Sequence, residues 1–324
     1  MRKKYKRIAY FLPFQGCERR CVYCDQRSIT GVGDVAFISP EEIAYALSTE
    51  PDPVELCFFG GSFASLPHAR MTGYLDAICA AREGGVVTFS SYPGDFEGAR
   101  GQALVETLAR YPIGTIELGV PSLDADVLRA CGRDDDPAAI LCAIETLRDA
   151  GFHLGVQLMT GLPGQSGESA IRDIDAMADL MPSGAAWHLR VYPCLVLAGT
   201  ELEARYRAGT YEPQSLEEAV RTAGAILLRA CERGFLPIRV GLLEGGLLRD
   251  AVVAGPYHPA FGELARSEMT ARALVAESPN GPWRIPKNKI SQLTGHNKRG
   301  IRRMAELSGI PANQVEAVIF AASI

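Results

Sequence analysis

The sequence has no long apolar run. Hydrophobic residues make up 47% of its 324 positions, yet the longest apolar runs are strand-sized, whereas a membrane-spanning helix needs about 20 apolar residues in a row. The start of the chain is basic, but the apolar stretch that follows at 8–13 is too short and too bulky for the core of a signal peptide. We therefore expect a cytoplasmic protein with no membrane partner.

The sequence also lacks low-complexity segments, internal repeats and any extreme of charge. Charged residues account for 22% of the chain and the formal net charge is −5, which is ordinary for a globular protein. A chain of this length forms one large α/β domain or a domain with an appendage. Its charge is unevenly placed, since residues 283–324 hold seven basic and two acidic residues, a local net charge of +5. This asymmetry predicts that the tail meets a polyanion.

The cysteine or histidine pair that would complete a zinc site is missing. Cys17, Cys21 and Cys24 form a C-x3-C-x2-C array directly after an apolar run, but there is no second C-x2-C motif or Cys/His pair. A structural zinc ion needs four ligands, and iron–sulfur clusters are also normally held by four cysteine thiolates. Three local thiolates with no obvious fourth would leave one iron open for a substrate or cofactor. We therefore favour an iron–sulfur cluster over zinc.

The other six cysteines are scattered through apolar segments. In a reducing compartment, thiols indicate metal binding or burial rather than disulfides, and a buried thiol packs as a small hydrophobic side chain. We expect packing roles for these residues: Cys57, Cys79, Cys131, Cys142, Cys194 and Cys231.

The body of the chain alternates strand-like apolar runs with segments of helical periodicity. Buried parallel strands are predicted at 8–13, 54–59, 85–90, 114–119, 152–159 and 185–192. Helices are predicted near 40–50, 67–82, 98–110, 122–131, 137–150 and 166–181. Six such units fit an α/β fold built as a partial (β/α)6 TIM-like barrel, but periodicity alone fits a doubly wound open sheet as well.

The C-terminal part departs from this alternation. Residues 200–234 are predicted to be helical, and residues 235–241 to form a further strand against the barrel edge. The Gly- and Pro-containing segment 276–282 is predicted to be a linker. We therefore expect two domains, a barrel with its extension over 1–275 and a small basic module over 283–324.

Polar and glycine-bearing motifs follow the predicted strands. Besides the cysteines, they are Gly60–Ser62, Ser90–Ser91, Glu117, Gly161–Gly164 and Arg190–Pro193. In parallel α/β barrels, ligands bind on the face made by the carboxyl ends of the strands. These motifs are therefore predicted to converge on one site.

The cysteine array, with Tyr23 just before its last cysteine, is similar to the signature of radical S-adenosylmethionine (SAM) enzymes. The segments that carry the resemblance further are 14–17, 25–31, 59–63, 117–120, 161–164 and 254–261. They resemble the branch that contains the catalytic subunit of the Elongator tRNA-modifying complex and its short bacterial relatives. The resemblance spans most of residues 5–265.

The resemblance implies a partial barrel and a [4Fe-4S] cluster held by the three array cysteines. In this family the unique iron chelates S-adenosyl-L-methionine, which one electron cleaves to a 5′-deoxyadenosyl radical. An electron donor such as flavodoxin or ferredoxin is then an expected partner. The hard chemistry belongs to the cofactor, while the protein supplies position and excludes water.

The resemblance also implies which residues contact the cofactor. They are Tyr23, Gly60, Gly61, Ser62, Phe63, Ser90, Ser91, Glu117, Gln157, Met159, Arg190 and Tyr192. For three of them a packing or pairing role is the alternative: Tyr23 and Met159 as apolar filling, and Glu117 as the partner of an arginine. Buried Arg190 would need an anion, either a SAM carboxylate or a substrate phosphate. Relatives often carry arginine in place of Tyr92 and glutamine in place of Pro121.

The loop 255–262 is predicted to cap the open barrel. It holds Tyr257 and His258, which we expect as catalytic residues, either contacting substrate or acting in acid–base chemistry. The alternative is an ordinary surface histidine.

The tail is predicted to form a strand (283–286), a helix (288–294), a loop (295–298), a helix (299–307) and a strand (315–320). This order resembles a minimal KH module, in which a GXXG loop clamps the nucleic-acid backbone. Here Lys298 replaces the second glycine. The residues expected to contact RNA are Gly295, Lys298, Arg299 and Arg302. The alternative is a basic helical hairpin with no ligand.

These expectations favour a radical SAM enzyme that modifies RNA, with tRNA first. The resemblance implies a separate acetyltransferase domain for wobble-uridine carboxymethylation, so we do not expect that reaction from these residues alone. Two alternatives stay open: radical chemistry on a small molecule, as in coproporphyrinogen-oxidase-like relatives, with the tail serving assembly; and a non-catalytic RNA-binding sensor that carries the cluster.

Overall fold

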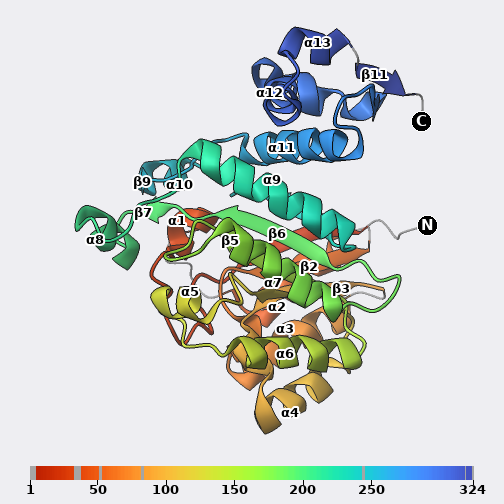
Figure 1. The fold of residues 1–324 in the computed structure, drawn as a ribbon. Helices are drawn as coiled ribbons and strands as arrows, with labels where there is room; N and C mark the ends of the chain where they lie inside the picture. The colour runs from red at the N-terminus through yellow and green to blue at the C-terminus, as the bar shows by residue number, and fades with distance from the viewer. Residues whose placement is uncertain are drawn as a thin grey trace.

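The computed structural model describes residues 5–32, 38–50, 53–81, 84–242, 245–317 and 319–322. Its centre is one sheet of seven parallel strands in the order β1-β2-β3-β4-β5-β6-β8. The strands are β1 (Lys6–Phe11), β2 (Val54–Phe59), β3 (Val86–Ser91), β4 (Ile113–Gly119), β5 (Leu154–Thr160), β6 (His188–Pro193) and β8 (Leu236–Val240). The sheet curls into a half-barrel (Figure 1). Because the strands follow one another without the reversal of order that a doubly wound sheet requires, the partial barrel is confirmed.

Helices cover the convex face of the sheet. They are α2 (Pro40–Ser48), α3 (His68–Ala81), α4 (Gly98–Leu108), α5 (Ala125–Ala130), α6 (Pro137–Asp149), α7 (Gly167–Asp179) and α9 (Leu216–Glu232). The helix predicted near 40–50 is confirmed as α2. Pro40 is the first helical residue of α2, and Ser39 and Glu42 each accept the other's backbone N–H in a capping box.

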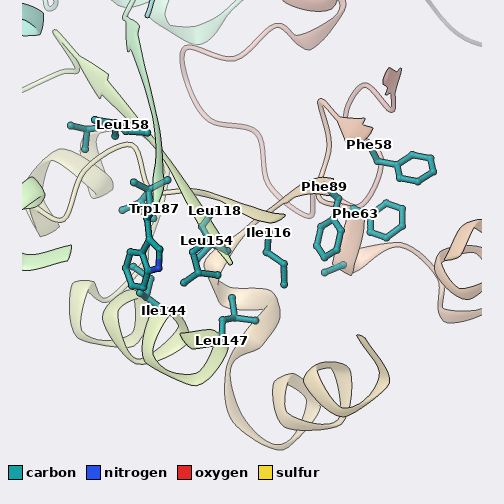
Figure 2. Close-up of a cluster of buried hydrophobic side chains, with 14 of the residues drawn as sticks. Phe58, Phe63, Phe89, Ile116, Leu118, Ile144, Leu147, Leu154, Leu158 and Trp187 are labelled. Atoms are coloured by element: carbon teal, nitrogen blue, oxygen red, sulfur yellow. The ribbon is translucent and has the colours of Figure 1, made fainter. Parts of the chain in front are cut away.

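Strand alternation separates an apolar outer face from a more polar inner face. In β2, Leu56 and Phe58 are buried against the helices, while Glu55 and Cys57 point to the opposite side. Figure 2 shows the core between sheet and helices, with Phe58, Phe63 and Phe89 at one end and Trp187 with its neighbours at the other. The apolar side chains thus stabilise the barrel from outside, and its inner face is left for polar groups.

Short elements surround the carboxyl ends of the strands. Besides α1 (Gln26–Thr30), they are the antiparallel pair β7 (Val196–Leu197) and β9 (Val252–Ala254), and the helices α8 (Glu201–Arg207) and α10 (Gly246–Ala251). Leu195, Leu197, Leu248, Ile29 and Tyr257 belong to one small apolar cluster that joins these elements.

The tail packs on α11 (Phe261–Glu277), beyond the barrel (Figure 1). It consists of β10 (Trp283–Pro286), the 3-10 turn η3 (Lys287–Lys289), α12 (Ser291–Ser308), α13 (Ala312–Ala317) and β11 (Ile319–Ala322). Strands β10 and β11 are parallel neighbours. The loop predicted at 295–298 is confirmed, since those four residues leave helical geometry inside α12.

Two predictions for this region are wrong in part. The strand predicted at 315–320 begins only at Ile319. The residues before it are helical, because the backbone N–H groups of Gln314 and Val315 donate to the carbonyl oxygen of Pro311. The linker predicted at 276–282 is helical at its start, since α11 runs to Glu277.

The domain boundary stays a prediction. The apolar cluster of the tail includes Trp283, Ile285 and Met304, but also Ala271 and Leu274 of α11.

No helix among the described residues is long and apolar enough to cross a membrane.

Candidate cluster and cofactor site

The three array cysteines lie in the loop between β1 and α1. All three are half-buried free thiols. Two backbone hydrogen bonds form tight turns, from Cys17 N to Phe14 O (3.1 Å) and from Cys24 N to Cys21 O (3.0 Å). The side-chain amide of Gln26 also contacts Cys17, with 3.7 Å between Nε2 and Sγ. The loop is therefore held by its own backbone as well as by side chains.

The array thiols influence one another electrostatically. Burial, together with the neighbouring Cys21 and Cys17, raises the pKa of Cys24 to about 12. Burial likewise raises the pKa of Cys17, with a further contribution from Cys21. Since a bound cationic centre would reverse this cost, the three thiols suit a shared metal cluster.

The cysteine loop offers three thiols as its donor set. Among the residues that the structure describes, the array cysteines included, no group of three or more His, Cys, Asp and Glu side chains is placed to hold a metal ion. This absence does not distinguish zinc from a cluster. The donor set itself fits a cluster with three protein ligands, because three thiols of one loop influence one another electrostatically.

The glycine turn after β2 packs directly on the cysteine loop. Ser62 N donates to Gln15 O at 2.8 Å. A Cβ at Gly61 would lie 2.0 Å from Gln15 O, and a Cβ at Gly16, whose φ is +74°, would lie 2.0 Å from Ser62 O. Both glycines are needed because the two backbones approach more closely than any side chain permits.

The polar side chains of this turn are engaged within the protein. The Ser62 hydroxyl donates to Asp95 and accepts from Tyr92 N at 2.9 Å. Ser91 Oγ accepts from Ala64 N at 3.0 Å, and Ser90 Oγ donates to Gly61 O at 3.2 Å. Phe63 lies in the outer core, with its ring centroid 4.7 Å from that of Phe58. These contacts support the turn, and the predicted contacts of these residues with a cofactor stay predictions.

The sequence analysis did not identify Asp95, whose carboxylate holds the serine side chains of this turn in place. Its carboxylate accepts from Ser62 and Ser65. Burial raises the pKa of Asp95 to about 6, although the two serine hydrogen bonds act in the opposite direction. Its position directly after the third strand is the signal that could have identified it, since the other polar motifs follow strands in the same way.

An ion pair crosses the inner face of the barrel. Arg190 donates to both carboxylate oxygens of Glu117 at 2.6 Å, and Gln157 Nε2 donates to the same carboxylate at 3.1 Å. The side chains of Glu117 and Arg190 are 3% and 16% exposed. Burial alone would lower the pKa of Arg190, but the hydrogen bonds and charge of Glu117 raise it above its ordinary value. The structure shows the pairing that is the alternative for Glu117, while its contact with a cofactor stays a prediction. An anionic ligand at Arg190 would have to compete with this pair.

Arg133 is a second residue that the sequence analysis missed. Its guanidinium lies 3.9 Å from Cys21 Sγ, donates to Gly119 O at 3.0 Å and stacks 4.6 Å from the Tyr92 ring centroid. It also pairs with Asp135 at 2.9 Å. A buried cation therefore lies next to the cysteine loop and against the ring of Tyr92. Sequence analysis did not identify Arg133 because an arginine followed by three aspartates is typical of a solvated, exposed segment.

Tyr23 and Met159 pack in one apolar cluster beneath the cysteine loop, together with Val22, Cys131 and Cys194. Burial holds the pKa of Tyr23 well above its ordinary value. Burial also raises the pKa of Tyr192, whereas the charge of Arg190 lowers it. The packing alternative thus describes Tyr23 and Met159 in this structure, and their contact with adenine stays a prediction.

The expectation for the remaining cysteines is half right. Cys57, Cys131 and Cys194 are buried. Cys79, Cys142 and Cys231 are exposed, because each lies on a helix of the outer layer at a position that the core does not cover. Apolar neighbours in sequence did not reveal which face of the helix each cysteine occupies.

The loop with Tyr257 and His258 connects β9 to α11 and lies beside the end of β6. His258 Nδ1 accepts from Ala260 N at 3.0 Å. Its ring centroid is 6.2 Å from that of His296, which belongs to the loop within α12. The rim of the barrel and the tail therefore meet at these two histidines.

Some of the basic residues of the tail are paired with acidic ones. Lys298 Nζ donates to Glu316 at 2.7 and 2.8 Å, Arg299 pairs with Glu217 of α9 at 2.7 Å, and Arg302 donates to Asn297 O. The local charge of +5 is thus partly neutralised. The RNA contacts predicted for Gly295 and these three side chains stay predictions.

Comparisons with known proteins agree with this geometry. The sequence model of the radical SAM superfamily matches residues 11–177, and that of the radical SAM C-terminal domain matches residues 186–271. The chain is 28% identical to a tRNA uridine(34) acetyltransferase of Methanocaldococcus infernus over 49% of this chain and 29% of that protein. It is 26% identical to Elongator complex protein 3 of Dictyostelium discoideum over 70% and 44% of the two chains.

A further relative is the heme chaperone HemW of Lactococcus lactis, at 26% identity over 62% of this chain and 52% of that protein. The archaeal Elp3 structure of Methanocaldococcus infernus superimposes with a TM-score of 0.60 at 19% identity, covering 83% of this chain and 63% of that one. At this identity the likeness shows the fold alone. The chain spans less than half the length of the first two relatives.

Proposed function

Because this chain belongs to the radical SAM superfamily, we propose that it is an enzyme that modifies RNA, with tRNA as its substrate class. Its cofactors are a [4Fe-4S] cluster and S-adenosyl-L-methionine, as throughout the family. When bound, they supply one-electron cleavage of the sulfonium carbon–sulfur bond. What remains to be proposed is the molecule on which that chemistry acts.

The residues of this chain have distinct parts in the proposal. Cys17, Cys21 and Cys24 would hold the cluster, and the Gly60–Gly61 turn keeps bare backbone beside it. Arg133 offers a cation next to Cys21 for the carboxylate end of the sulfonium donor. The proposal includes an electron donor such as flavodoxin or ferredoxin. It also includes a cytoplasmic location, because free thiols persist in reducing compartments.

One observation carries the choice of RNA. The loop 295–298 of the basic tail lies against the rim loop of the barrel, through His296 and His258. A nucleic acid held by the tail would therefore reach the carboxyl ends of the strands, where a barrel binds its ligands. The relative that is named a tRNA uridine(34) acetyltransferase supports the same choice.

Nucleoside analysis tests this proposal. Total tRNA from a strain lacking the protein should miss one modified nucleoside, or accumulate its precursor, when measured by mass spectrometry. The wild-type gene should restore it and the Cys24→Ala variant should not. An unchanged nucleoside profile would count against RNA as the substrate.

A small-molecule substrate is the second candidate. The heme chaperone relative favours it, and so does the neutralisation of Lys298 and Arg299 by acidic residues. Gel-shift titration of tRNA at low salt separates the two. Because phosphate contacts depend on cationic side chains, the RNA proposal expects a shift that weakens several-fold in Lys298→Ala and Arg299→Ala. Absence of any shift favours the small molecule.

The cluster itself is tested by reconstitution. After anaerobic reconstitution, wild-type protein should hold about four irons and release 5′-deoxyadenosine from SAM under reduction. Alanine at Cys17, Cys21 or Cys24 should abolish iron binding, whereas the exposed Cys142→Ala serves as the matched control. A wild-type cluster that never cleaves SAM would favour the sensor alternative.

A further inference from the structure

Gln26 follows the cysteine array by two positions and is the first residue of helix α1. The N-cap side chain of Asp25 starts this helix, and Thr30 Oγ1 donates to Gln26 O at 2.7 Å. The side chain of Gln26 is half-buried and turns back to the cysteine loop, where it contacts Phe14 and Cys17. Its amide group is therefore held at a defined place beside one of the cluster ligands.

Two contacts decide which way round this amide lies. The backbone N–H of Phe14 donates to Gln26 Oε1, and only the oxygen end of an amide can accept such a bond. Because the oxygen faces Phe14, the NH2 group faces Cys17, with 3.7 Å between Nε2 and Sγ. The hydrogen-bond network thus fixes the orientation of the amide and directs a donor at the sulfur.

The residue on the other side of the amide has a strained backbone. Phe14 has a φ of +60°, a region that bulky residues rarely enter. Its ring lies under the guanidinium of Arg20, which is 3.8 Å from the ring centroid. Such strain persists only where the surroundings hold it, and it concentrates at functional sites. Gln26 therefore joins the strained start of the cysteine loop to the first ligand of the array.

The same amide also acts on a second thiol. Burial raises the pKa of Cys24, and a hydrogen bond from Gln26 acts in the opposite direction. At Cys17 burial and the hydrogen bond from Gln26 oppose each other in the same way. Gln26 thus offers its N–H groups to two of the three ligand sulfurs. Hydrogen bonds to the sulfurs are one of the factors that set the reduction potential of an iron–sulfur cluster.

We propose that Gln26 is a positioning residue that raises the reduction potential of the cluster by donating hydrogen bonds to its cysteine sulfurs. The claim rests on the cluster of the function proposed above and is independent of the RNA substrate. Reduction transfers one electron from the flavodoxin- or ferredoxin-class donor to the cluster and breaks no bond. The added negative charge is shared with the thiolates, so an N–H donor at sulfur stabilises the reduced state more than the oxidised one.

A redox titration of the reconstituted full-length protein tests this proposal. Dithionite is the reductant, and the EPR signal of the reduced cluster gives the potential without added SAM. Gln26→Met keeps the length of the side chain but has no N–H group. It should shift the reduction equilibrium toward the oxidised state by up to about fivefold, the value of one hydrogen bond, which is about 40 mV at 59 mV per tenfold for one electron. A wild-type potential in Gln26→Met with its iron bound overturns the proposal.

The variant Gln26→Glu separates donation to sulfur from support of the loop. Its carboxylate can still accept from Phe14 N but places an oxygen where the amide nitrogen lies. Because a negative charge then replaces the donor, the potential should fall further than in Gln26→Met. If Gln26 only supports the loop, Gln26→Glu should match wild type. This variant decides the question if Gln26→Met fails to take up iron.

Gln165 provides the matched control. It is also half-buried, its Oε1 accepts from Leu162 N at 3.2 Å, and its Nε2 donates to Met159 O at 3.0 Å. Gln165→Met therefore removes the same two kinds of hydrogen bond from a turn without touching a ligand sulfur. It should lower the melting temperature and leave the potential unchanged. An equal fall in potential in both variants would show that general loosening is the cause, which contradicts the proposal.

The two proposals fail separately. If the potentials of the Gln26 variants match wild type while tRNA from the deletion strain lacks a modification, only the role of Gln26 is wrong. If the potential falls as expected and no tRNA nucleoside changes, RNA modification is wrong and the role of Gln26 stands.

Discussion

At the scale of single residues, burial decides which charges matter in this protein. Glu117 and Arg190 form a bidentate pair that is almost fully enclosed, whereas Asp126 and Arg129 form a pair that is mostly exposed. Exposed pairs contribute little to stability, while removing one partner of a buried pair leaves a charge without compensation.

Glu117→Gln should therefore lower the free energy of unfolding by about 3 kcal/mol, because the Arg190 guanidinium loses its counter-ion. Asp126→Asn, the exposed control, should stay within about 0.5 kcal/mol of wild type. Urea unfolding measures both. The double variant Glu117→Leu with Arg190→Met should recover much of the loss, since it removes both charges. Equal effects of the two single variants would contradict this account.

The buried carboxyl group of Asp95 should make the free energy of unfolding depend on pH. Its pKa of about 6 in the folded protein lies above that of the unfolded chain, so the folded state binds the proton more tightly. Stability from this group is therefore present below about pH 4 and is lost as the pH rises through about 6.

The variant Asp95→Asn stays uncharged at every pH. Its free energy of unfolding, relative to wild type, should rise by about 2 kcal/mol between pH 4 and pH 7 and then level off. Urea unfolding at unit pH steps measures the difference. A difference that does not vary with pH would show that Asp95 titrates normally.

At the scale of elements, the close approach of two loops is the controlling feature. The cysteine loop and the glycine turn after β2 meet backbone to backbone, and the atoms against Gly61 are carbonyl oxygens that cannot move aside as a flexible side chain would. The position of the cluster ligands therefore depends on a residue that cannot itself bind iron.

Gly61→Ala should destabilise the fold by about 2 kcal/mol or more, as expected for overpacking against rigid backbone, and should reduce iron uptake. Gly167→Ala is the matched control, because its Cβ would meet only Thr222 at 3.7 Å, an ordinary contact, at the start of α7. Thermal unfolding and iron content after reconstitution measure both. Normal iron content in Gly61→Ala would show that the loops can separate.

At the scale of the whole molecule, the tail is fixed to the barrel by a buried carboxylate. Glu268 of α11 has a fully buried side chain that accepts from Arg272 at 2.6 Å and from Arg303 of α12 at 3.0 Å. Gly224 of α9 makes room for it, since a Cβ there would lie 2.3 Å from the Glu268 Cγ. Glu268 thus joins α11 to the tail and packs against α9 of the barrel.

Glu268→Gln should loosen the tail without unfolding the barrel. Amide hydrogen exchange should become faster in α12 and β10, by about tenfold or more for a loss of 1.4 kcal/mol, and stay unchanged in β4 and β5. Glu263→Gln, which removes an exposed partner of His296, is the control and should change little. Faster exchange throughout the chain would mean that the tail and the barrel unfold together.

Local patterns in the sequence determined most of the architecture. Apolar runs and helical periodicity predicted the strands and helices of the body, and the Gly-x-x-Lys segment at 295–298 predicted the break in α12. The cysteine spacing placed three thiols in one loop. Each of these features depends on residues within a short stretch of the chain, so a single sequence is enough to predict it.

The tertiary structure decided which polar groups meet. Glu117 and Arg190 are 73 residues apart, Ser62 and Asp95 are 33 apart, and Arg133 and Cys21 are 112 apart. The same holds for the tail, where Arg299 is neutralised by Glu217 of another helix. No periodicity or spacing encodes such partners, because they are brought together only when the sheet curls and the loops at its carboxyl edge close on one another.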